Sequence, residues 1–105
     1  MSAAPNPARG EAGFRVGGEA ILLRPSFAAL VAAEAELGPL FALVERAAEG
    51  RLALGEMACL FFHCAAERPA GVTRERIGEA IAEAGLANAT PALRILLTQI
   101  LQGRV

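Results

Sequence analysis

The residues of this chain that could do metal or nucleophilic chemistry lie close together, between positions 56 and 64. Cys59 and His63 are four positions apart, which places two side chains on one face of a helix and could present two ligands to a metal ion. His63 is the only histidine and the chain has no aspartate, so no third ligand is evident beside them. We therefore expect no metal site, and we expect Cys59, His63 and Glu56 to share an exposed polar face.

The same histidine could serve as a general base for a cysteine nucleophile, either Cys59 or Cys64. Neighbours on one helix rarely converge on a common reacting atom, and the sequence shows neither an orienting carboxylate nor an oxyanion loop. Five residues apart on a helix, the two cysteine side chains diverge by about 140°, so we expect free thiols that are buried or half-buried. The glycines are not spaced as a phosphate-binding loop. The sequence thus predicts no catalytic residue, no cofactor and no enzyme.

Glu34 is the one acid inside an apolar helical stripe, which it shares with Phe27, Leu30 and Val31. A carboxylate buried there without a partner would cost several kcal/mol. Its head group could reach water near the helix end. It could instead pair with an arginine (Arg24 or Arg46) or with the free N–H groups at another helix start. Each of these alternatives makes Glu34 a candidate structural acid and not a catalytic one.

The elements that position these residues can be read from the pattern along the chain. Residues 1–12 are rich in alanine and proline without periodicity, which predicts a disordered lead-in. Residues 13–105 are expected to form a single domain. It opens with GFRVGGEAILLR, where Gly17-Gly18 predicts the turn of a β-hairpin.

From Ser26 onward the apolar residues recur with helical spacing. Start and stop signals predict five helices, beginning after Ser26, at Pro39, after Leu52, after Thr73 and at Thr90-Pro91. The stripe of the last helix consists of Leu93, Leu96, Leu97, Ile100 and Leu101. The expected fold class is α+β and mostly helical, with an N-terminal β-hairpin packed on about five short α-helices.

Charge and hydropathy limit the classes of partner. The formal net charge is −1, so the chain has no overall field that would attract nucleic acid or an anionic membrane. No apolar run approaches the ~20 residues of a membrane span, and no secretion signal is evident. We expect a soluble protein of the bacterial cytoplasm that binds neither nucleic acid nor membrane. The arginines between Arg68 and Arg76 keep a small regulatory or DNA-binding helical domain as a minor alternative.

Four apolar residues fall at the edges of the predicted stripes or opposite them. Several such residues in a chain without a catalytic set indicate a docking or self-association surface. Tight packing in a small bundle could also cover them. The candidate partner-binding surface consists of Phe41, Leu60, Phe62 and Ile95.

Several short motifs in this chain are similar to those of a known protein family. The motifs are the hairpin with Gly17-Gly18, Ser26 followed by Ala28-Ala29-Leu30, Glu34, Leu37-Gly38, and the run from Ala48 to Leu52. With these residues the chain resembles the small tail assembly proteins of gene transfer agents and related tailed phages. The match runs from about Gly10 to Leu52 and continues with less specific patterning to the C-terminus.

The resemblance implies a tail assembly chaperone, which coats the tape-measure protein and helps tail-tube subunits polymerise around it. The tape-measure protein and the tail-tube protein are therefore the expected partners, and a helix-in-groove contact would suit them. The alternative is a structural tail component, either a tube or a minor tail protein. A tube subunit should need long strands, and the sequence predicts one short hairpin, so the chaperone is the preferred interpretation.

Overall fold

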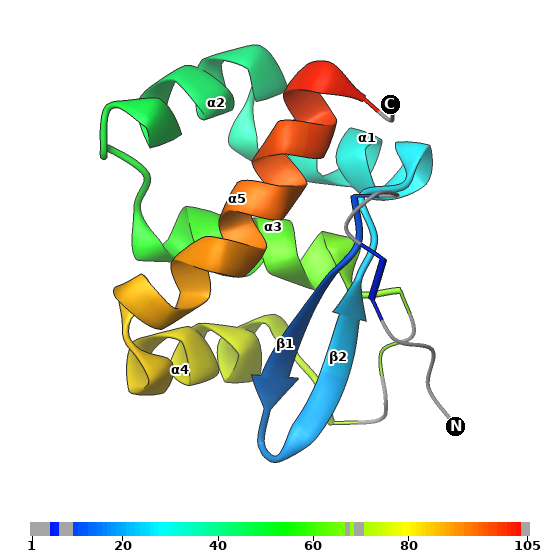
Figure 1. Cartoon of the computed structure of the whole chain (residues 1–105), viewed down its shortest axis with the longest axis vertical. Helices are drawn as coiled ribbons and strands as arrows, with labels where there is room; N and C mark the ends of the chain where they lie inside the picture. Colours follow the sequence, from blue (N-terminus) through cyan, green and yellow to red (C-terminus); the bar gives the residue numbers. More distant parts are fainter. Residues whose placement is uncertain (1–4, 7–9, 67, 69–70, 104–105) are drawn as a thin grey trace.

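The computed structural model describes residues 5–6, 10–66, 68 and 71–103. Two strands and five helices follow one another in the predicted order, which confirms the α+β, mostly helical fold (Figure 1). Their bounds are β1 Ala12–Val16, β2 Glu19–Leu23, α1 Phe27–Leu37, α2 Leu40–Ala48, α3 Leu54–Cys64, α4 Arg74–Ala84 and α5 Leu86–Gln102.

The hairpin of β1 and β2 turns where the sequence predicts it. The strands pair antiparallel from Ala12 opposite Leu23 to Val16 opposite Glu19. Gly17 and Gly18 have φ values of 57° and 85°, the left-handed conformation that a tight two-residue turn needs and that glycine adopts most easily. The outer edge of β2 is partly covered by the segment after α3, where the Ala66 amide donates to the Leu22 carbonyl at 2.9 Å.

Local capping signals set the ends of α1 and α4 as predicted. The Ser26 hydroxyl accepts a hydrogen bond from the Ala29 amide, and the Thr73 hydroxyl accepts one from the Arg76 amide, each at 3.2 Å. These bonds satisfy amides in the first turn that have no partner within the helix. Gly38 follows α1 with a φ of 86°, as expected of a glycine that ends a helix.

The start of the last helix was predicted wrongly. We expected Thr90-Pro91 to open it, but α5 begins at Leu86, directly after Gly85, and carries Pro91 inside. The Thr90 hydroxyl donates to the Leu86 carbonyl at 2.7 Å and so bonds within the helix instead of capping it. Inside the helix, Pro91 has no amide to bond the carbonyl of Ala87, and α5 nevertheless continues through this position.

The face that α1 buries also differs from the prediction. Of the expected stripe, Phe27, Val31 and Glu34 are exposed, whereas Leu30 is half-buried against the core. The fully buried residues of α1 are Ala29 and Ala33. Alanine leaves little bulk between two helices, so α1 can lie close against α3. Hydropathy alone favoured the larger side chains, and close backbone approach selected the smaller ones.

Helix α3 lies at the centre of the core. Its buried residues are Met57, Ala58, Cys59, Leu60, Phe61 and Cys64. Helix α1 packs on one side of it and α4 on another. Phe61 is fully buried, and its ring meets the ring of Phe14 edge to face, with 5.3 Å between centroids. The core therefore joins the hairpin to the helices in one unit.

No single helix within the described residues is long and apolar enough to cross a membrane. Helices α1 and α2 meet that test only together, and they are bent by 75° relative to each other.

The folded part begins earlier than residue 13. Of the predicted lead-in, residues 1–4 and 7–9 lie outside the described residues. Gly10 is buried, Glu11 is 3% exposed, and Ala12 opens β1. The Glu11 carboxylate accepts a hydrogen bond from the Arg24 guanidinium at 3.0 Å and another from the Asn6 amide at 3.2 Å. A buried acid that is tied to Arg24 fixes this segment to the end of β2.

Gly10 supplies a test of that boundary. Its φ is +76°, and a Cβ at this position would stand 2.4–2.6 Å from side-chain atoms of Gln99 in α5. Gly18 has a similar φ of +85° but open space around it. Placing alanine in this left-handed region costs roughly 1–2 kcal/mol at either position. We expect Gly10→Ala to lower the free energy of unfolding further than Gly18→Ala does, measured by urea denaturation. Equal losses would mean that residue 10 does not pack against α5.

Candidate functional site

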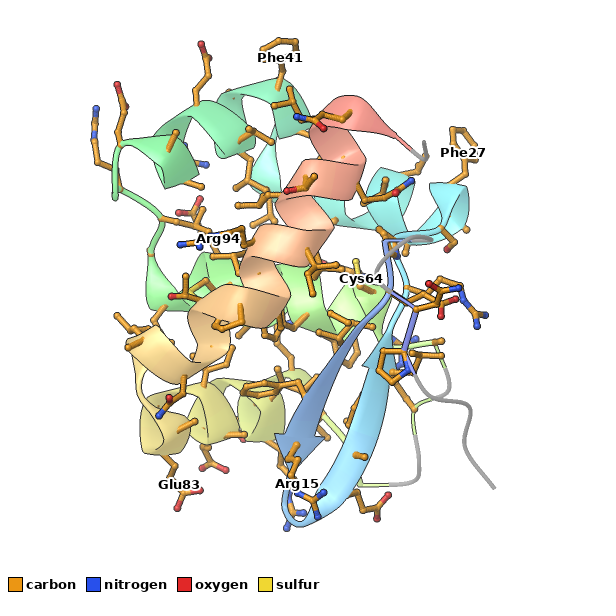
Figure 2. The ribbon with its side chains drawn as sticks, viewed as in Figure 1. Arg15, Phe27, Phe41, Cys64, Glu83 and Arg94 are labelled. Atoms are coloured by element: carbon orange, nitrogen blue, oxygen red, sulfur yellow. The ribbon has the colours of Figure 1, made fainter. Side chains whose placement is uncertain are left out.

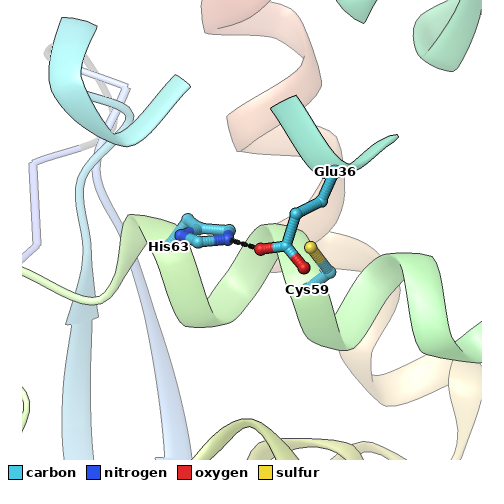
Figure 3. Close-up of side chains that lie close together, drawn as sticks. All are labelled: Glu36, Cys59 and His63. Carbon is cyan, nitrogen blue, oxygen red and sulfur yellow. Dashed lines mark hydrogen bonds and ion pairs between the residues drawn. The ribbon is translucent and has the colours of Figure 1, made fainter. Parts of the chain in front are cut away.

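The structure brings a third polar side chain to the two that the sequence singled out. Glu36, near the end of α1, lies against Cys59 and His63 of α3, and one ligand atom of each residue lies within 4.8 Å of the others (Figure 3). The His63 Nε2 atom donates a hydrogen bond to the Glu36 carboxylate. The expected exposed polar face is wrong: Cys59 is 4% exposed, and Glu56 and His63 are half-buried. Sequence spacing could not find Glu36, since it comes from another helix.

Arg74, from the first turn of α4, completes this cluster. Its guanidinium donates to both oxygens of Glu36, at 2.6 and 2.8 Å. These bonds, with the one from His63, lower the pKa of the Glu36 carboxyl to about 2. The guanidinium groups of Arg74 and Arg68 also lie over the Phe62 ring, 5.1 and 4.3 Å from its centroid.

The donor set suits an ion-pair network better than a metal centre. A metal ion bound by Glu36, Cys59 and His63 would meet the positive charge of Arg74, which already occupies both carboxylate oxygens. Burial first, and the nearby Glu36 charge second, raise the pKa of the Cys59 thiol. A thiol ligand must lose its proton to bind a metal, so this environment opposes ligation.

The same environment opposes nucleophilic catalysis. Burial also raises the pKa of the Cys64 thiol, to about 12. Both cysteines are free and buried, as predicted from their spacing. Reactive cysteines have lowered pKa values and partial exposure, and neither thiol meets these conditions. The cluster therefore holds α1, α3 and α4 together.

The low pKa of Glu36 makes this contribution depend on pH. A carboxyl group whose pKa is lower in the folded state stabilises the fold above its ordinary pKa of 4.5 and loses that effect as the pH falls towards 2. We expect Glu36→Gln to lower the Tm at pH 6, and the difference from the wild type to shrink between about pH 4.5 and pH 2. In an Arg74→Gln background the same substitution should cost less. A difference that does not change with pH would contradict the assignment.

Glu34 takes one of the structural roles that the sequence left open. It is exposed, and its Oε2 atom accepts a hydrogen bond from the amide of Leu40, the first residue of α2, at 3.0 Å. The two arginines considered as partners are bound elsewhere, since Arg24 pairs with Glu11 and Arg46 pairs with Glu56. Glu34 thus joins the end of α1 to the start of α2.

The role of Glu34 can be tested by separating its oxygen from its charge. Loss of a side-chain acceptor at a helix start typically costs about 0.5–2 kcal/mol. We expect Glu34→Ala to lower the free energy of unfolding within that range, and Glu34→Gln, which keeps an acceptor oxygen, to cost less. Chemical denaturation measures both. If Gln and Ala were equally destabilising, the contribution would come from the charge and not from the hydrogen bond.

The four residues predicted to form a partner-binding surface do not lie together. Phe41 on α2 is 71% exposed, as a docking residue should be. Leu60 is 0% exposed, so its assignment to a surface is wrong; α3 is covered on nearly every side. Phe62 is half-buried beneath two arginines, and Ile95 is half-buried and packs against the core.

Phe41 belongs to a larger set of exposed apolar side chains. Among the described residues they are Phe27, Val31, Phe41, Leu54, Leu86 and Leu101. Phe27 on α1 and Phe41 on α2 both point away from the body of the molecule (Figure 2). Phe27 is 85% exposed because α1 buries its alanine face instead. The candidate interaction surface therefore centres on Phe27 of α1 and Phe41 of α2.

Comparison with known proteins gives one match. A protein-family model described as "Phage tail tube protein, GTA-gp10" matches residues 9–103, nearly the whole chain. No curated protein and no solved structure matches this chain.

Proposed function

This chain belongs to the family described as phage tail tube protein, GTA-gp10, and we propose that it acts in tail assembly as a chaperone of the tape-measure protein. It would work in the cytoplasm of the bacterial host, keep the tape-measure protein soluble, and hand it to polymerising tail-tube subunits. The tape-measure and tail-tube proteins are its proposed partners.

The size of the sheet is the observation that carries this proposal. Within the described residues the sheet has two strands of five residues each, and one outer edge is partly covered by residues 65 and 66. A tube closed by strand pairing between subunits needs strands long enough to tilt and stagger around a ring. A short hairpin packed on helices offers little for that purpose.

Exposed aromatic side chains give further support. A protein that shields an apolar partner needs apolar side chains on its surface, and such contacts can be released when assembly proceeds. Phe27 and Phe41 provide two of them on neighbouring helices. A folded protein gains nothing in its own stability from rings that remain in water.

A structural role in the tail is the second candidate. The family description names a tail tube protein, and this wording favours a structural component over a chaperone. In that case the protein would remain in the particle, and the exposed residues of α1 and α2 would contact neighbouring subunits.

Co-expression with the tape-measure protein of the same gene cluster distinguishes the two functions. We expect the tape-measure protein to be soluble only with this chain, to co-purify with it, and to lose solubility with Phe41→Ser. Glu83→Ser is the matched control, because Glu83 lies on α4 at the opposite end of the molecule (Figure 2). The chaperone should be missing from purified particles, as judged by mass spectrometry. Stoichiometric presence in particles, with no effect on the tape-measure protein, would establish the structural role instead.

A further inference from the structure

An open groove runs between α2 and α5 and is not explained by the fold. Apolar side chains from both helices line it: Val44, Ala47 and Ala48 from α2, and Leu93, Leu97 and Leu101 from α5. Its volume is about 380 Å³. The two helices also contact each other directly. The three leucines are spaced four residues apart, so they form one row along α5.

A second row on α5 borders this groove. It consists of Thr90, Arg94, Thr98 and Gln102, again at intervals of four residues. On the far side of the row lies another hollow of about 720 Å³, lined by Pro91, Ile95 and Gln99 among others. A ridge of side chains four residues apart, with a groove on each side, is the surface into which a second helix packs.

The charge of Arg94 indicates which kind of helix could bind in the groove. Among the described residues, Arg94 is the only charged one that lines either hollow, and it makes no hydrogen bond or ion pair with another of them. Most other arginines are occupied; Arg46 and Arg74, for example, each pair with a glutamate. A cation covered by an apolar partner loses its water, so the partner must bring a carboxylate to it.

Length and charge together favour an outside partner over a second copy of this chain. The lining residues of α5 span Thr90 to Gln102, about 18 Å at 1.5 Å per residue. Helix α2, which carries Phe41 and Glu45 on its outer side, has nine residues and spans about 12 Å. The groove therefore fits a longer helix better than α2 of another copy. Helix α5 of another copy is long enough, with 17 residues, but it has no acidic residue that could meet Arg94.

We infer that the groove between α2 and α5 binds an apolar α-helix of the tape-measure protein that places a carboxylate against Arg94. This inference rests on the proposed function and adds the site and the chemistry of the bound segment.

Overlapping peptides that cover the tape-measure protein provide the test, with binding measured by fluorescence anisotropy. The peptides that bind should form amphipathic helices with a glutamate or aspartate beside the apolar face. Arg94→Glu should weaken them by about tenfold or more, and a peptide whose acid is replaced by arginine should recover affinity for that variant. Ala48→Phe, which fills the groove from an exposed position, should also weaken binding. Arg76→Glu is the control, since Arg76 is exposed on α4 and lines neither hollow.

Several outcomes would overturn the inference. Binding that is unchanged in Arg94→Glu and Ala48→Phe, or bound peptides without an acid, would place the contact elsewhere. Sedimentation of the wild type as a dimer that Arg94→Glu dissociates would assign the groove to a second copy. If both variants still solubilise the tape-measure protein, the chaperone function stands and the groove assignment fails. If the wild type neither solubilises it nor binds any peptide, both fail. Circular dichroism confirms that each variant is folded.

Discussion

Six of the eleven residues of α3 are buried, on nearly every side of the helix. In a chain of 105 residues, the other elements must therefore be arranged around this one. Helix α1 covers the side that carries Cys59, α4 covers another, and the hairpin reaches the core through Phe14 against Phe61. The helices and strands around α3 are short. Apolar contacts alone therefore do not fix the position of each element relative to α3.

Hydrogen bonds and ion pairs of glutamate side chains fix these positions. Glu11 holds the segment before β1 to Arg24, Glu34 caps the start of α2, and Glu36 ties α1 to Arg74 of α4. Glu56 binds both Arg46 and the Ala53 amide, so it links the end of α2 to the start of α3. Arginine suits this purpose, since its planar guanidinium can bond both oxygens of one carboxylate. The acids thus act at the joints between elements, where directional bonds restrict geometry most.

Much of the fold could be predicted because its signals are local. Ser26, Gly38 and Thr73 mark helix ends through bonds made within a few residues, and Gly17-Gly18 determines the turn in the same way. The start of α5 was missed because Thr90 and Pro91 resemble a first turn but tolerate a position further inside the helix. That error concerns a boundary and leaves the order of the elements unchanged.

The site was harder to predict because it depends on which helices meet. Glu36 completes the cluster with Cys59 and His63 from 23 or more residues away, and no periodicity along α3 refers to it. The buried face of α1 was chosen by the close approach of Ala29 and Ala33 to α3, which hydropathy cannot express. Leu60 was assigned to the surface because the sequence does not reveal that α3 has neighbours on several sides.

The burial of both cysteines has a practical consequence for chemical labelling. Maleimides and similar reagents attack thiolates, and in this fold Cys59 and Cys64 are protonated and shielded from solvent. A cysteine introduced on the exterior would then be the preferred point of attachment for a fluorophore or spin label, with both native cysteines kept. Because the native thiols are unreactive, a probe can be attached at one chosen surface position without their removal.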